Sequence, residues 1–162
     1  MPALVLAAGL ALPAAARACP DAAHLAALSA APERVADPAL LDCALSALTH
    51  SLPFETLIAL HQRRIALARP GDGDGPLDPL RRMADLAEVL ILADRLDEAD
   101  AALARAEALL SRARPQTSMP RMRLLVLAGD LALRRNQPEA AHRALAEAVR
   151  LGEGQVSAVL RD

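Results

Sequence analysis

The chain has 162 residues, of which 54% are hydrophobic and 23% are charged, and its formal net charge is -2. This composition fits one ordinary globular domain and excludes a largely disordered chain. With no net positive charge and Phe54 as the only aromatic residue, the chain offers neither a basic surface for a phosphate backbone nor rings on which bases stack. We therefore expect no nucleic-acid partner.

The first eighteen residues have the layout of a secretory signal peptide. An apolar run from Ala3 to Leu12 is followed by Pro13 and by small residues that end at Ala18, directly before Cys19. The run is too short to span a membrane. A signal peptide usually has basic residues before its apolar run, and none is present here. The alternative is therefore a first core helix of the folded domain. We expect a cleaved signal peptide at 1–18 and a periplasmic or secreted domain at 19–162.

Cys19 and Cys43 are the only cysteines of the chain. An even pair of cysteines in an exported protein predicts one disulfide. Lipid anchoring at Cys19 is an alternative, although the residues before it match a bacterial lipobox poorly. A zinc site that adds His24 and His50 is a second alternative, but its spacing is unusual for such sites. We therefore expect a disulfide and no metal site.

Prolines mark the expected beginnings of helices. Pro38 and Pro79 each follow an aspartate that can cap a helix, and Pro120 follows Ser118 less closely. Proline is well tolerated in the first helical turn because the amide that it lacks has no partner there. The three prolines are evenly spaced in the sequence, and a fixed period of this length indicates stacked units of helices.

Between these prolines, apolar residues recur at helical spacing and no alternating strand pattern occurs. We expect an all-α domain with helices at about 21–31, 38–50, 53–68, 79–93, 96–113, 120–135 and 138–151. Short connections at 51–52, 94–95 and 136–137 predict antiparallel helical hairpins. The segment 69–76, rich in glycine and proline, is the expected linker, because it lacks the glutamate of a calcium loop.

Small residues in the second half of the chain recur with nearly the same period as the prolines. Gly129 precedes Ala141 by twelve residues, as Ala87 precedes Ala99, and leucines surround both pairs. The patterns Met83-x2-Leu86-Ala87-x2-Leu90 with Ala99-x3-Leu103-x2-Ala106, and Leu125-x2-Ala128-Gly129-x2-Ala132 with Ala141-x3-Leu145-x2-Ala148, resemble the tetratricopeptide repeat (TPR). Larger side chains at these positions would force the helices apart. The structural repeat positions are Ala87, Ala99, Gly129, Ala141 and Ala148.

The resemblance implies an α-α superhelix of about three TPR-like helix pairs, at approximately 38–70, 79–115 and 120–152. The period is longer than that of the family, which implies a longer loop at 112–119. The first pair is a degenerate repeat or an N-terminal cap, because His61 and Arg64 stand where the pattern has leucine and alanine. The alternative is a plain antiparallel helical bundle with alanine-rich crossings.

A superhelix of this kind presents a concave face that holds other chains. The groove positions of the family correspond to Arg81, Ala84, Glu88 and Ile91 in one repeat and to Arg123, Val126, Asp130 and Leu133 in the next. From these we expect protein-binding residues, with arginines facing acidic groups of the partner. They are Arg81, Glu88, Arg123, Asp130 and Arg134. The family's carboxylate clamp is absent, since Ala84 and Glu88 stand where lysine and asparagine are expected.

The sequence has no catalytic signature. Its four histidines form no metal-binding pair, and neither a glycine-rich phosphate loop nor a nucleophile motif is present. We expect no enzymatic activity, no cofactor and no small-molecule substrate. The resemblance implies an exported adaptor that binds a segment of another envelope protein and meets the membrane only through that partner. The alternative is a structural subunit of an envelope assembly.

Overall fold

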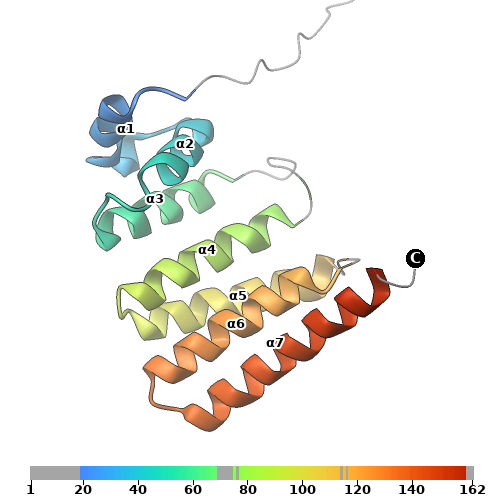
Figure 1. Ribbon diagram of the computed structural model, residues 1–162. Helices are drawn as coiled ribbons and strands as arrows, with labels where there is room; N and C mark the ends of the chain where they lie inside the picture. The colour runs from blue at the N-terminus through green and yellow to red at the C-terminus, as the bar shows by residue number, and fades with distance from the viewer. Residues whose placement is uncertain (1–18, 69–74, 76, 114, 116, 160–162) are drawn as a thin grey trace, which may run out of the picture.

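The computed structural model describes residues 19–68, 75, 77–113, 115 and 117–159. The expected signal peptide at 1–18 and most of the expected linker at 69–76 lie outside these residues. The described part of the chain is entirely helical, which confirms the all-α class. Its elements are α1 (Ala22–Ser29), the 3-10 helix η1 (Pro32–Arg34), α2 (Pro38–Leu48), α3 (Phe54–Ala66), α4 (Asp78–Leu92), α5 (Leu96–Ala113), α6 (Met119–Arg134) and α7 (Pro138–Val159) (Figure 1).

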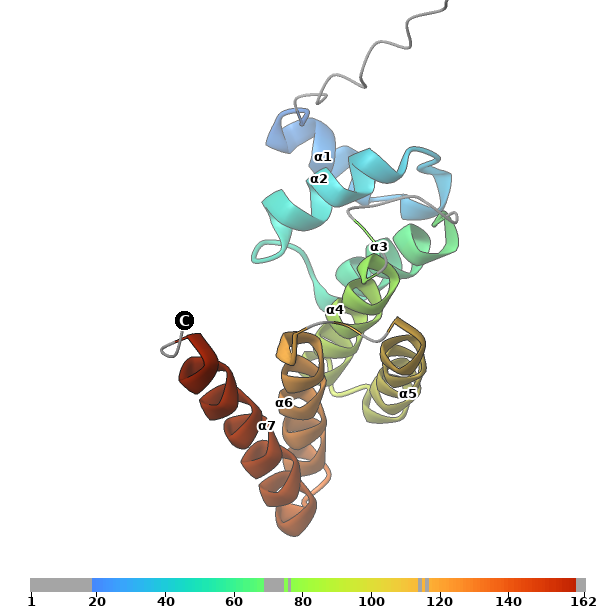
Figure 2. The same ribbon diagram turned by 90° about the vertical axis from the view of Figure 1, so that its right-hand side faces the viewer.

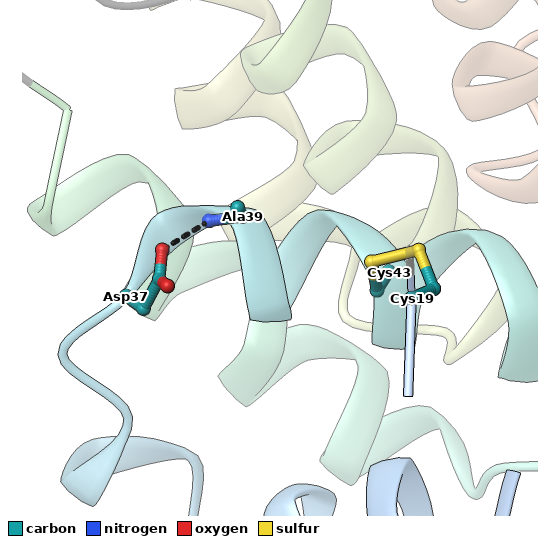
Figure 3. Close-up of a disulfide and its surroundings, with 4 residues drawn as sticks. All are labelled: Cys19, Asp37, Ala39 and Cys43. Atoms are coloured by element: carbon teal, nitrogen blue, oxygen red, sulfur yellow. Dashed lines mark hydrogen bonds between the residues drawn. A yellow bond between two sulfur atoms is a disulfide. The ribbon is translucent and has the colours of Figure 1, made fainter. Parts of the chain in front are cut away.

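The helices begin largely where the prolines predict, although their first turns differ in detail. At α2, the side chain of Asp37 accepts a hydrogen bond from the Ala39 amide at 2.9 Å (Figure 3). At α4, the prediction that Asp78 caps the helix was wrong. Asp78 is the first helical residue, and its buried carboxylate forms ion pairs with Arg81 and Arg82 instead. These pairs hold the carboxylate inside the first turn.

Two of the hairpin turns are built alike. Asp94 after α4 and Asn136 after α6 have positive φ angles of 59° and 56°. The amide of Arg95 donates to the carbonyl of Leu90, and in the later hairpin the amide of Gln137 donates to the carbonyl of Ala132. These are the hydrogen bonds of a Schellman turn, in which aspartate and asparagine tolerate the left-handed conformation. The same turn therefore closes both hairpins.

The second helices of three successive pairs keep a constant spacing. α3, α5 and α7 begin at Phe54, Leu96 and Pro138, which are evenly spaced in the sequence. Arginines at the turns connect each of the first two of these helices to the following pair. Arg95 donates to Glu55 in the first turn of α3, and Arg135 donates to Asp97 in the first turn of α5. The sequence period thus also applies to contacts between pairs.

The helices follow one another as a stack, with α4 near its centre. α4 packs against α3, α5 and α6, and α6 lies between α5 and α7 (Figures 1 and 2). The larger apolar core extends from α3 to α6 and contains Ile58, Leu90 and Leu103. A smaller core joins α1, α2 and α3 around Leu25 and Leu41. None of the helices in the described residues is long and apolar enough to cross a membrane.

Cys19 and Cys43 form a disulfide, as predicted (Figure 3). Their Cα atoms are 5.6 Å apart, and the bond closes a loop across a sequence separation of 24. Cys19 precedes α1, and Cys43 lies in the middle of α2, beside the smaller core. The disulfide therefore fixes the N-terminal end of the described chain to the first helix pair.

One predicted helix boundary was wrong. α7 continues to Val159 instead of ending near 151, and Gly152 and Gly154 lie inside it. No proline follows Pro138 to stop the helix, and one glycine costs a helix only about 1 kcal/mol. The loop expected at 112–119 is confined to 114–118, because α5 runs to Ala113 and α6 begins at Met119, close to the predicted ends at 113 and 120. The extra length of the period is therefore partly helix.

Candidate functional site

The five small residues of the repeat pattern are all buried where helices cross. Gly129 has the closest approach, since a Cβ atom built there would lie 2.7 Å from the Cγ atom of Leu145 on α7. Real Cβ atoms do not come so close to other heavy atoms, so any larger residue must displace Leu145. In the preceding pair, Ala87 and Ala99 are fully buried in the larger core. The two C-terminal hairpins therefore have tight interiors.

The interior of the first helix pair, α2–α3, differs from those of α4–α5 and α6–α7. The spacing of the second helices relates His61 to Leu103 and Arg64 to Ala106. Arg64 is buried, with 6% of its side chain exposed, and its Nε donates to Asp42 Oδ1 on α2 at 2.7 Å. His61 is only partly exposed. Polar side chains thus occupy positions that are apolar in the next pair.

An open groove of about 860 Å³ lies where α2, α3 and α4 meet. α3 and α4 run in opposite directions, so residues near the start of α3 face residues near the end of α4 (Figure 1). One end of the groove is mostly apolar, with the polar Thr49 and His50 beside it, and the other end is charged, with His61 between the two. The apolar end contains Leu52, Phe54, Leu57, Val89 and Leu92. The charged end contains Asp42, Arg64, Arg81, Arg82, Asp85 and Glu88.

His61 contributes no full charge to the groove at neutral pH. Burial lowers the pKa of its imidazole below the usual 6.5, because the charged form loses contact with water. The carboxylates of Asp85, Glu88 and Asp42 act in the opposite direction, and Arg123 adds to the lowering. A neutral imidazole offers one hydrogen-bond donor and one acceptor. It can therefore contact polar groups of a ligand without setting the charge of the groove.

The predicted binding residues have partners within the molecule. Arg123 on α6 contacts Asp85 at 2.7 Å and Glu88 at 2.9 Å on α4. Arg134 lies 3.9 Å from Asp130 one helical turn earlier, and Arg81 pairs with Asp78. Arg81 and Glu88 line the groove, with Arg123 beside Glu88, whereas Asp130 and Arg134 lie farther along α6. The structure thus brings only part of the predicted set to one place.

Two positions expected on the groove surface lie in the core. Ala84 and Ile91 are fully buried, because α4 is covered by α3 as well as by α5 and α6. The equivalent residues of α6, Val126 and Leu133, are about half exposed. The concave face expected from two equivalent repeats is therefore interrupted at α4.

Several groove residues were not predicted. No sequence pattern pointed to Asp42, Phe54 or Leu92, because their place in the groove depends on how α2 and α3 pack against α4. The one usable signal was the misfit of His61 and Arg64 to the repeat pattern. Both residues lie on α3, one of the helices that line the groove.

No family model, curated protein or solved structure matches this chain. Within the described residues, no group of three or more histidine, cysteine, aspartate or glutamate side chains is placed to hold a metal ion.

Proposed function

We propose that this protein is an exported, non-enzymatic adaptor that binds a segment of another envelope protein. The observation that carries the proposal is the open groove between α2, α3 and α4, with one apolar and one charged end. Its open shape suits a stretch of polypeptide more than an enclosed small molecule. Phe54 and Leu92 at the apolar end are 45% and 46% exposed, so apolar surface is available to a partner.

A TPR-like superhelix is the architecture that we propose for this adaptor. Two equivalent Schellman turns and the constant spacing of α3, α5 and α7 support it. Repeat proteins of this kind commonly use extended surfaces to bind other chains. In this chain the binding surface lies at the first pair, where the repeat pattern is weakest, because that pair leaves space beside α4.

Export is the second element of the proposal. The layout of residues 1–18 is typical of a signal peptide, and the disulfide is compatible with an oxidising compartment. Intact-mass measurement of protein recovered from such a compartment tests it. We expect the loss of residues 1–18 and of two hydrogens. A full-length chain with two free thiols would contradict export.

The groove is tested by photo-crosslinking in the native cell. The chain has no lysine, so amine-directed reagents have no side chains to modify. Replacing Phe54 with the photoreactive analogue p-benzoylphenylalanine keeps an aromatic ring at the apolar end of the groove. We expect one discrete adduct from this position. The same analogue at Val149, which is exposed on α7 and outside the groove, should give no such adduct.

A blocking variant makes this test specific. Ser46 lines the groove from α2, and Ser46→Trp fills part of it. Its neighbour Ala47 is exposed on the same helix but does not line the groove, so Ala47→Trp is the matched control. The adduct should disappear with Ser46→Trp and persist with Ala47→Trp. An adduct that survives both changes, or no adduct from position 54, would refute the groove as the binding surface.

One observation favours the second candidate, a structural subunit of an envelope assembly. Met119, Val126 and Leu133 are large apolar residues, each about half exposed, that recur every seventh position on α6. Residues at this spacing share one face of a helix, and exposed apolar surface of this kind often marks a contact with another protein. Co-fractionation distinguishes the candidates. A subunit stays in one large complex at all protein concentrations, whereas an adaptor dissociates on dilution.

A further inference from the structure

We propose that Arg64 makes the groove selective for a segment in which a single acidic side chain precedes or follows an aliphatic one. This inference rests on the proposed function and specifies the chemistry of the partner. The observation behind it is a buried hydrogen-bond donor without an acceptor. Nη1 of Arg64 is buried and has no hydrogen-bond partner among the described residues. A buried charged donor without an acceptor is costly, and a ligand carboxylate would satisfy it.

Arg64 is held ready for such a ligand. Its Nε donates to Asp42, which fixes one edge of the guanidinium group and leaves Nη1 for another acceptor. Asp42 is itself 53% exposed, so water weakens the charge that it presents to Arg64. Because Nη1 is covered in the free groove, a ligand must displace a lining side chain to reach it. A carboxylate on a side-chain stem can reach it more easily than one attached to the backbone.

The charges between Arg64 and the apolar end of the groove disfavour a second carboxylate on that stretch of the ligand. Asp85 and Glu88 both line the groove, and both contact the same guanidinium, that of Arg123. Two carboxylates that share one arginine leave a negative charge in excess on this side of Arg64. By contrast, Arg81 and Arg82, near the start of α4, share the one carboxylate of Asp78. A single acidic side chain at Arg64 can avoid the negative excess, whereas a run of acidic residues that continues toward the apolar end would extend over it and be repelled.

The apolar end of the groove selects the aliphatic residue of the ligand. Phe54 and Leu92 are half exposed, and the more buried Leu57 and Val89 lie beside them. Phe54 and Arg64 are ten positions apart on α3, a distance of about 15 Å along a helix. An extended peptide covers this distance in about four or five residues. We therefore expect the aliphatic anchor to lie that far from the acidic residue.

Selection from phage-displayed random dodecamers, fused so that no terminal carboxylate is free, tests the inference on the mature, oxidised protein. We expect enrichment of one aspartate or glutamate about four or five residues from leucine, isoleucine or methionine. Enrichment of peptides without an acidic residue would overturn the role of Arg64 while leaving the adaptor function intact. No enrichment of any peptide would count against the adaptor function itself.

Two variants with opposite expected effects complete the test, with an enriched peptide capped at both ends as the probe. Arg64→Gln should weaken its binding by about tenfold or more. Asp42→Asn should strengthen it, because Arg64 loses its competing carboxylate but keeps a hydrogen-bond acceptor. Arg105→Gln, at an exposed arginine outside the groove, is the control and should bind as the parent does. Equal binding of the acidic peptide and its Glu→Gln analogue would refute the inference, even if Arg64→Gln fails to fold.

Discussion

The first helix pair and the two that follow it use the same spacing of second helices for different purposes. In α4–α5 and α6–α7, alanine and glycine let the helices approach until leucines fill the interior. In α2–α3, Arg64 and His61 occupy the corresponding positions of the second helix, and an open groove lies beside them. The difference teaches that a helix pair can carry larger and polar residues at these positions and still keep the spacing of its second helix, even though only part of the Arg64 guanidinium has a hydrogen-bond partner.

The largest loss of stability is expected when an arginine is introduced into the second helix pair, at the position that corresponds to Arg64. Ala106 corresponds to Arg64 and is fully buried in the larger apolar core. Ala106→Arg would bury a charge without a partner, which should cost about 3–5 kcal/mol of the free energy of unfolding. Urea denaturation measures this cost.

The control for that substitution lies on the same helix. Ala104 is exposed on α5, so Ala104→Arg should change the free energy of unfolding by less than about 0.5 kcal/mol. Similar denaturation midpoints for the two arginine variants would mean that the interiors of the first and second pairs do not differ as described.

A smaller effect is expected at the α6–α7 crossing. Gly129→Leu must displace Leu145 and should cost about 1–3 kcal/mol. At Gly154 on α7 a Cβ atom would meet nothing within 4 Å, so Gly154→Leu should be neutral or slightly stabilising. Thermal or urea unfolding compares the two variants. Equal changes in stability at the two sites would contradict the close contact between Gly129 and Leu145.

The smallest effect should be a pH dependence that belongs to the first pair. The pKa of His61 is lowered in the folded state, so between that value and the unfolded value of 6.5 the unfolded chain binds more protons. The stability of the protein should therefore fall as the pH drops below 6.5. In His61→Gln this part of the decline should be missing, as measured by urea unfolding on either side of that pH. Parallel declines in both proteins would contradict it.

The sequence predicted the helices and the disulfide well, because both depend on local or simple pairwise signals. Helical periodicity, first-turn prolines and an even number of cysteines need no knowledge of distant neighbours. Even there, the end of α7 was missed, since a glycine such as Gly152 weakens a helix without stopping it.

The candidate site was harder to predict, because it depends on how helices cover one another. Ala84 and Ile91 were assigned to an exposed groove on the pattern of a regular repeat, but α3 packs close to α4 and buries them. The sequence also gave no sign that the guanidinium of Arg123 bridges Asp85 and Glu88 within the molecule. A sequence pattern gives the face of a helix on which a residue lies, but not what already occupies that face.

The matching turns after α4 and α6 also bear on how such a chain can change in length. The same backbone conformation and the same hydrogen bonds close both hairpins, so their connecting turns are equivalent. Tandem duplication of the stretch from the first residue of α4 to the residue before α6 would add a module whose ends match those of its neighbours. The array could grow in this way at its C-terminal side without altering the groove at its N-terminal side.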